Sequence, residues 1–288
     1  MSTVERTAAG PVPPYRRFLR RRDGRAPLWV ELAVAGWLFW LYDVINNFAP
    51  ERRQYALHNG LNMLAFEHSL GIGLEHTLDR WLSAHSVLAF IATYYYFFAH
   101  ALVTAALLAI MWWRTPALYR RMRTQLVLIN LIAFVVFWRY PLAPPRMFPA
   151  LGFHDVVAST HAVISWDSAA LTHDADQFAA MPSLHIAWAS WSALAIWRLA
   201  RTHAARALGP LHLALTAFVV VATGNHYLVD VLAGAATAAL GVGLQAGGAR
   251  IVVAWRARGG ARAERSARLP GPLGEPRAAS PTPDGGPL

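Results

Sequence analysis

The sequence predicts an all-α polytopic membrane protein with six transmembrane helices and an active site at their extracytoplasmic ends. Of its 288 residues, 56% are hydrophobic, 12% aromatic and only 15% charged, which is too apolar for an ordinary soluble domain. Six apolar stretches are long enough, at roughly 20 residues each, to cross the hydrocarbon of a bilayer. These expected spans lie near residues 28–48, 86–113, 124–142, 182–200, 208–224 and 227–248.

The placement of arginine sets the expected orientation of these spans. Arginine clusters precede the first span and follow the second, fourth and sixth spans, at Arg16, Arg17, Arg20, Arg21 and Arg22; Arg114, Arg120, Arg121 and Arg123; Arg198, Arg201 and Arg206; and Arg250, Arg256 and Arg258. By the positive-inside rule, we expect these loops and both termini to be cytoplasmic. The segments 49–85 and 143–181 are then extracytoplasmic, and the plasma membrane is the expected location.

The two ends of the chain are rich in Arg, Gly, Pro and Ala. We expect residues 1–27 to form a disordered basic tail and residues 251–288 a disordered Arg-, Gly- and Pro-rich tail, with the six-helix domain at 28–250 between them. The first span lacks a small-residue cleavage site and is interpreted as a retained anchor rather than a signal peptide. Apolar residues at helical spacing over 57–82, interrupted by Glu and His, favour an amphipathic helix in the outer interface.

The charge balance and the absence of cysteine exclude several classes of function. With no cysteine, the chain has no disulfide, thiolate metal site or cysteine nucleophile. The net charge of +10 comes from arginines at the ends of apolar stretches and not from a basic patch interleaved with aromatic residues. This arrangement argues against nucleic acid as a partner and favours anionic lipid headgroups.

Two short runs, MPSLH and GNHYLVD, carry the residues best suited to catalysis. In the second run, His226 and Asp230 are four residues apart, so on a helix they share one face and the carboxylate can fix the tautomer of the imidazole. In the first run, Pro182 suits the first position of a helix, which would leave amides near Ser183 available to an anion. His185 ends this run and supplies a second imidazole.

These runs resemble two motifs of the type 2 phosphatidic acid phosphatase superfamily: Pro-Ser-Gly-His, with Leu184 in the glycine position, and the His-x3-Asp part of the third motif. The full third motif of that superfamily is Ser-Arg-x5-His-x3-Asp, and here Val219 and Val220 stand where Ser and Arg would be. The first motif, Lys-x6-Arg-Pro, is approximated by Arg139 and Arg146, with six residues between them. The resemblance extends from roughly residue 86 to 248 and is greatest to the branch that contains the inositol phosphorylceramide synthases.

The resemblance implies a metal-independent, cofactor-free enzyme that moves a phospho-headgroup, such as phosphoinositol, from a membrane phospholipid to an alcohol through a phosphohistidine. His226 would be the nucleophile, and Asp230 would hold its other ring nitrogen. His185 would protonate the leaving oxygen and then activate the acceptor. The phosphate-binding residues would be Arg146, Arg139 and Ser183. Because the inositol phosphorylceramide and sphingomyelin synthases also lack the arginine of the third motif, the pattern favours transfer over hydrolysis.

Three alternatives stay open at this point. Water in place of an alcohol would make the protein a phosphatase of phosphatidic acid or a polyprenyl diphosphate. The spacing of His226 and Asp230 also occurs in metal sites, and a second metal site is conceivable in the loop that holds His154, His161 and His173. A transporter or assembly factor that keeps the fold with a degenerate site is the non-enzymatic alternative.

Polar residues elsewhere in the expected spans are weaker candidates. Asp43, Asn46 and Asn47 form a polar stripe near the outer end of the first span, where they would either contact a lipid headgroup or solvate the helix end. His100, behind the aromatic run YYYFF, would either line the cavity or bond to a neighbouring helix.

Overall fold

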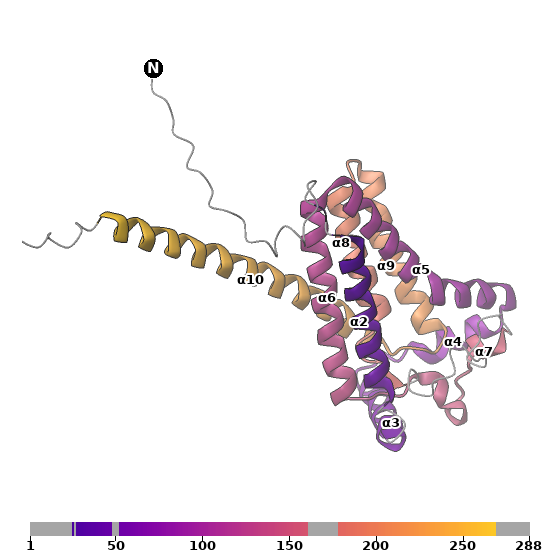
Figure 1. Ribbon diagram of the computed structural model, residues 1–288. Coiled ribbons are helices and arrows are strands. Elements are labelled where there is room, and N and C mark those ends of the chain that lie inside the picture. Colours follow the sequence, from indigo (N-terminus) through magenta and orange to yellow (C-terminus); the bar gives the residue numbers. More distant parts are fainter. Residues whose placement is uncertain (1–24, 26, 48–51, 161–177, 269–288) are drawn as a thin grey trace, which may run out of the picture. The chain divides into compact units, whose positions relative to one another are not determined.

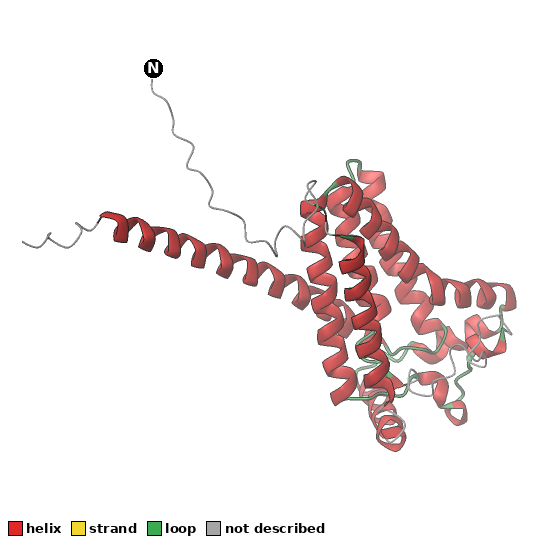
Figure 2. Ribbon diagram, viewed as in Figure 1, coloured by secondary structure: helices red, strands yellow, loops and turns green. Residues whose placement is uncertain are grey.

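The computed structural model describes residues 25, 27–47, 52–160 and 178–268, and these ranges are helical throughout their regular parts (Figures 1 and 2). Within them the only β-type pairing is an isolated bridge between Leu142 and Ala179. The α-helices are α2 (Leu28–Asn47), α3 (Arg53–Ser69), α4 (Glu75–Ser83), α5 (Ser86–Arg114), α6 (Pro116–Arg139), α7 (Val156–Ser159), α8 (Leu184–Leu199), α9 (His203–Ala222) and α10 (Leu228–Arg268). Two short 3-10 turns, Pro145–Met147 and Pro149–Leu151, lie between α6 and α7.

Five of these helices, α2, α5, α6, α9 and α10, are long and apolar enough to cross a membrane. The membrane character expected from the sequence is therefore confirmed. Side chains on their outer faces agree with a lipid environment, since Phe39 and Trp113 are each 72% exposed and Leu102 is 63% exposed. Large apolar side chains at this exposure are unfavourable in water and normal in lipid.

The remaining expected span, the fourth at 182–200, corresponds to α8, which has only 16 residues. At 1.5 Å per residue it is roughly 24 Å long, shorter than the hydrocarbon core of a typical bilayer. It lies at the centre of the described bundle, where Ala187, Trp191 and Ala195 are fully buried against α5, α6 and α10. The Trp191 indole donates a hydrogen bond to the Met122 carbonyl at 2.9 Å. The helix is thus largely a core element, and its exposed residues, Trp197 and Arg198, lie near its C-terminal end.

The two motif runs, MPSLH and GNHYLVD, and the loop after α6 meet at one end of the long helices, beside α3, α4 and α7 (Figure 1). Backbone hydrogen bonds join these segments: the Arg146 amide donates to the Gly224 carbonyl at 2.8 Å, and the Ser183 amide donates to the Asp230 carbonyl at 3.2 Å. The Leu142 amide donates to the Phe178 carbonyl at 2.8 Å. Segments that are far apart in the sequence are therefore fixed to one another by the main chain.

The segment 57–82 differs from the single interfacial helix expected from its sequence. It forms α3 and α4, separated by a turn in which Gly71 has a φ of +69°. The acidic residues that interrupt its apolar pattern are buried rather than solvated, with Glu67 and Glu75 at 1% exposure and Asp79 at 0%. Their carboxylates accept hydrogen bonds from backbone amides elsewhere in the chain, which explains why they point inward.

The C-terminal boundary also differs from expectation. The sequence placed an irregular tail from residue 251, but α10 continues to Arg268. Ala, Arg and Glu, which dominate this stretch, are strong helix formers, and Pro270 lies just beyond the helix end, where proline disfavours helix in the preceding residue. Contacts divide the chain into two compact units, Met1–Gln245 and Ala246–Leu288, and the first unit contains the site described below. The expected tails at 1–24 and 269–288 lie outside the described residues.

Candidate active site

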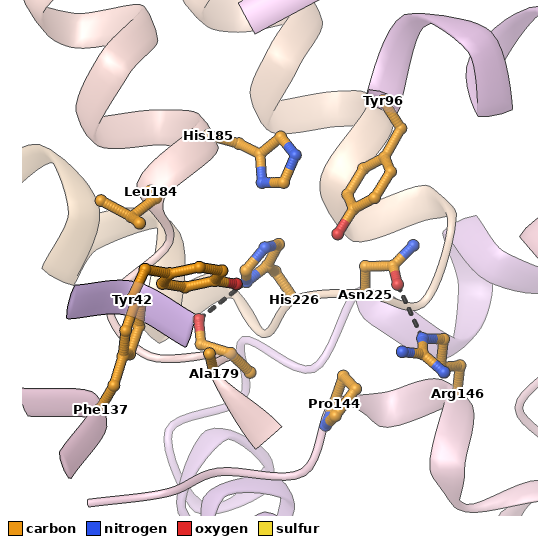
Figure 3. Close-up of a pocket in the computed structure, with 11 residues that line it drawn as sticks. Tyr42, Tyr96, Phe137, Pro144, Arg146, Ala179, Leu184, His185, Asn225 and His226 are labelled. Carbon is orange, nitrogen blue, oxygen red and sulfur yellow. Dashed lines mark hydrogen bonds between the residues drawn. The ribbon is translucent and has the colours of Figure 1, made fainter. Parts of the chain in front are cut away.

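The three motif segments surround a cavity with a volume of about 460 Å³, including its open mouth. One side is mainly apolar and holds Tyr42, Phe137 and Leu184, whereas Asn225 and Arg146 lie on the opposite side (Figure 3). His185 and His226 also line the cavity, with their ring centroids 5.7 Å apart. The arrangement places two imidazoles and a guanidinium around one space, next to a wall suited to an apolar substrate.

His226 is held by a main-chain oxygen that sequence reasoning missed. Its Nδ1 lies 2.9 Å from the Ala180 carbonyl and 3.4 Å from Oδ2 of Asp230. A carbonyl can only accept, so Nδ1 carries the proton and donates it, which leaves the lone pair on Nε2. Asp230 lies close to Nδ1, as predicted, but the Ala180 carbonyl makes the shorter contact with this nitrogen.

Asp230 is fully buried and belongs to the start of α10. Its Oδ2 accepts a hydrogen bond from the Tyr227 amide at 3.0 Å. This bond closes the first turn of the helix and satisfies one of the amides that a helix N-terminus leaves without an intrahelical partner. The carboxylate therefore acts both on the helix start and, through its proximity to Nδ1, on the imidazole of His226.

His185 lies in the first turn of α8 and packs against two side chains of α5. Its ring stacks on Tyr96, with centroids 4.3 Å apart at 24°, and meets His100 edge-on at 4.2 Å. His100 is held in turn by the Tyr96 carbonyl, 3.1 Å from its Nδ1. His100 therefore supports His185 instead of lining the cavity, because the residues at the cavity surface include Tyr96 and not His100.

Arg146 is the arginine that the fold brings to the cavity. It is 8% exposed; its Nε donates to Oδ1 of Asn225 at 2.7 Å (Figure 3), and its Nη1 lies 3.3 Å from Oδ2 of Asp155. Asn225 is itself held by Thr223, whose Oγ1 accepts from Nδ2 at 2.9 Å. Asn225 is a second residue that sequence reasoning missed, although it directly precedes His226.

Gly224 allows the loops of Arg146 and His226 to approach each other. Its φ of +67° lies in the left-handed region that favours glycine. A Cβ there would lie 3.2 Å from Oδ1 of Asp79 and 3.3 Å from the Cβ of Arg146.

Asp79 accepts hydrogen bonds from both the amide and the Nδ1 of His154 at 2.9 Å. Burial raises the pKa of the Asp79 carboxyl, and the hydrogen bonds from His154 oppose this effect.

Two of the predicted phosphate ligands occupy other positions. Arg139, at the end of α6, is exposed and stacks over Trp138, with its guanidinium carbon 5.9 Å from the ring centroid; it is absent from the cavity lining. Ser183 is buried and serves as the N-cap of α8, because its Oγ accepts from the Ile186 amide at 3.4 Å. Its own amide is bonded to Asp230, so it is not available to an anion.

The N-cap role of Ser183 also shifts the start of the fourth expected helix. Since Ser183 is the N-cap, α8 begins at Leu184, and Pro182 precedes the helix instead of occupying its first position. Serine caps a helix end by accepting from an amide two or three residues later, which proline cannot do.

The structure describes the side chains of only some of the remaining candidate site residues. Asp43 lies in α2 and is absent from the cavity lining, which α2 reaches through Tyr42. The side chains of Asn46 and Asn47 lie outside the described set. His154 is bonded to Asp79, whereas His161 and His173 fall in the undescribed range 161–177. The proposed loop metal site can therefore be assessed only at His154, which is bonded to a carboxylate.

A sequence profile of the PAP2 superfamily matches residues 61–244. The chain belongs to the PAP2 superfamily. No curated protein and no solved structure gives a significant match. The match covers Arg146, His185, His226 and Asp230, which the fold assembles at one cavity. Membership of the PAP2 superfamily indicates chemistry of the lipid phosphatase or phosphotransferase type.

One part of this PAP2 site departs from the usual third motif. Val219 and Val220, in place of Ser and Arg, are buried at 3% and 0% exposure within α9. Val220 packs with Ile186 and Val221 in an apolar cluster. The charge that an arginine would supply at this position is therefore absent from the site, and Arg146 is the cavity's arginine.

Proposed function

We propose that this protein is an integral membrane phosphotransferase that moves a phospho-headgroup between a lipid and an alcohol through a phosphohistidine on His226. The observation that carries this proposal is the hydrogen bond from Nδ1 of His226 to the Ala180 carbonyl at 2.9 Å. It leaves Nε2 as the nucleophilic nitrogen in a residue that lines the same cavity as His185 and Arg146. Nucleophile, proton donor and cation thus surround one cavity.

In the first step, Nε2 of His226 forms a bond to phosphorus, and the bond from phosphorus to the leaving oxygen breaks. His185, protonated before the step, gives its proton to that oxygen. The Arg146 guanidinium offsets the negative charge of the non-bridging oxygens. The Ala180 carbonyl and Asp230 stabilise the cationic ring that His226 becomes.

In the second step, the hydroxyl oxygen of the acceptor attacks phosphorus while His185 accepts the hydroxyl proton. The bond from phosphorus to Nε2 breaks, and His226 returns to its neutral state. An alcohol acceptor gives a new phosphodiester, whereas water gives a free phosphate or phosphomonoester. The apolar side of the cavity, with Phe137 and Leu184, suits the acyl or prenyl part of a lipid substrate.

We further propose that the acceptor is an alcohol and not water, because Val220 replaces an arginine of the hydrolytic motif. Hydrolysis of phosphatidic acid or a polyprenyl diphosphate is the second candidate, and it uses the same residues. Purified protein in detergent should be given phosphorus-labelled phospholipids with and without inositol or other alcohols. A labelled phosphodiester that depends on the alcohol supports transfer, and labelled phosphate alone would replace it with hydrolysis. His226→Ala should abolish both products.

The proposed steps require no metal ion, since Arg146 supplies the positive charge and His226 the nucleophile. Activity should therefore persist after treatment with a chelator. Activity that is lost on chelation and restored by one divalent ion would support the metal alternative instead.

A further inference from the structure

The N-terminus of α10 is held by carboxylates from three different places. The Tyr227 amide donates to Asp230 at 3.0 Å, the Leu228 amide to Oε1 of Glu75 at 3.0 Å, and the Val229 amide to Oε1 of Glu67 at 2.6 Å. Amides at the start of a helix have no intrahelical acceptor, and they carry the positive end of the helix dipole. Two of these three acceptors come from α3 and α4, outside the motifs.

Glu67 and Glu75 form a pair that requires a shared proton. Both are 1% exposed, and they accept hydrogen bonds from the amides of consecutive residues, Leu228 and Val229, which brings the two carboxyl groups together. No described donor reaches Oε2 of Glu67, and two ionised carboxylates cannot donate to one another. Burial, followed by the neighbouring carboxyl of Glu75, raises the pKa of Glu67 to about 9. One member of the pair is therefore a neutral carboxylic acid near pH 7.

The N-terminal half of α3, away from Glu67, supports the loop that carries Arg146. The Tyr227 hydroxyl lies 2.8 Å from the Ala143 carbonyl and 3.3 Å from the Gly60 carbonyl of α3. The Ala143 amide donates to the Ala56 carbonyl of α3 at 3.1 Å. The α3 helix therefore contacts both sides of the cavity, one through this loop and the other through the start of α10.

We propose that Glu67 and Glu75 are positioning residues of the phosphotransfer site: a carboxylic acid–carboxylate pair that anchors the first turn of α10 and so aligns His226 with Arg146. This inference rests on the proposed function. Neither glutamate lines the cavity, so both act through the backbone of residues 227–229. Misplacement of a catalytic group by about 1 Å can cost about 100-fold in rate, which makes such an anchor consequential.

The hydrogen-bonding pattern predicts which substitutions the pair tolerates. Glu67→Gln keeps an acceptor for the Val229 amide and gives Glu75 a permanent donor, so kcat at pH 7 should stay within about threefold of wild type. Glu67→Ala removes both bonds and should lower kcat about 100-fold with a smaller change in KM. Glu31→Ala is the control for loss of a carboxylate, since Glu31 pairs with Arg123 on α6 at 2.6 Å and is absent from the cavity.

The pH profile separates a shared proton from a simple cap. Glu67 interacts with Glu75 from α4 and with Asp230 and Tyr227 at the start of α10, so its ionisation above about pH 9 would add a further negative charge to this cluster. Wild-type kcat should therefore fall above that pH. Glu67→Gln cannot ionise and should keep its activity to higher pH, whereas Glu31→Ala should follow wild type.

Stability gives a readout that does not depend on catalysis. The folded protein keeps a proton on Glu67 that the unfolded chain releases above its ordinary pKa of 4.5, so the folded state binds more protons between that value and about 9. Raising the pH across this window therefore favours unfolding. The melting temperature of the wild type in detergent should fall across it, and Glu67→Gln should show a smaller fall.

These measurements distinguish the two proposals. If the wild type shows neither phosphotransfer nor hydrolysis but has the expected stability profile, the proposed function is overturned. The carboxyl pair is still supported in that case. Active wild type with a fully active Glu67→Ala, or with a folded Glu67→Gln as slow as Glu67→Ala, would overturn the positioning role. If Glu67→Ala does not fold, the alkaline profile of Glu67→Gln decides: an unchanged alkaline limb overturns the proposal, and an extended limb supports it.

Discussion

At the residue scale, Arg139 and Arg146 lie in different environments, although both match the spacing of the first motif. Arg146 is buried at the cavity and held by Asn225, whereas Arg139 is exposed over Trp138. The guanidinium of Arg146 makes two directed contacts through Nε and Nη1, a fork that an ammonium group cannot reproduce. The role of a positive charge at this site is therefore tied to its geometry.

Arg146→Lys should lower kcat/KM by about 10- to 100-fold, because charge-assisted hydrogen bonds contribute roughly 1.5–3 kcal/mol. Arg139→Lys is the matched control and should stay near wild type. Initial rates with a phosphorus-labelled lipid substrate provide the measurement. Equal losses in both variants would show that Arg139 contacts the substrate in the working enzyme, contrary to its exposed position.

The residues that sequence reasoning found and missed differ in how their contacts arise. His226 and Asp230 are four positions apart, so the backbone at the start of a helix brings them together. The Ala180 carbonyl is 46 residues from His226, and Asn225 is 79 residues from Arg146. A carbonyl leaves no side-chain signature, and a single asparagine has many uses. These two contacts depend on tertiary packing, which the one-dimensional pattern does not encode.

At the element scale, helix boundaries follow caps more closely than they follow hydropathy. The fifth span was expected to begin near residue 208, but α9 begins at His203 because Oγ1 of Thr202 accepts from the Ala205 amide at 3.2 Å. Ser183 sets the start of α8 in the same way. Apolar runs indicate where the helices lie, whereas polar capping residues determine where these helices begin and therefore how long they are.

The contact between α10 and the start of α8 depends on one glycine. A Cβ on Gly234 would lie 2.5 Å from the Ser183 carbonyl and 3.0 Å from the Cβ of Ile186. Gly234→Ala should therefore push the two helices apart, destabilise the fold by about 1–3 kcal/mol and lower kcat, since His185 and Asp230 lie on these helices.

Gly243→Ala provides a control on the same helix, because nothing lies within 4 Å of a Cβ at that position. It should be neutral or slightly stabilising, as alanine favours helix over glycine. Thermal unfolding in detergent and initial rates would compare the two variants. Similar behaviour of both would indicate that α8 and α10 do not pack closely at Gly234.

At the scale of the whole molecule, the crossing of α8 decides the topology. Five helices are long and apolar enough to span the bilayer, and α8 is shorter. If α8 also crosses, the loop before it and the loop after it lie on opposite sides. The arginines at 198, 201 and 206 then lie in the cytoplasm, and the cavity opens on the other side.

Single cysteines on either side of α8 test this arrangement. Ser159, on α7, and Ala204, in the first turn of α9, are both exposed, and the native chain has no cysteine to give background labelling. Ser159→Cys should react with an impermeant thiol reagent in intact cells, and Ala204→Cys only after permeabilisation. Labelling of both or of neither in intact cells would mean that α8 does not separate the two sides, and the reverse pattern would place the cavity in the cytoplasm.

The covalent role of His226 is tested most directly by trapping the phosphoenzyme. Wild-type protein should be incubated briefly with phosphorus-labelled phospholipid, quenched in alkali and digested, and the modified residue and nitrogen should be identified by mass spectrometry and comparison with phosphohistidine standards. We expect an acid-labile adduct on Nε2 of His226, because Nδ1 donates to the Ala180 carbonyl, and no adduct in His226→Ala. Wild-type turnover by His226→Ala, or an adduct on Nδ1, would contradict this expectation.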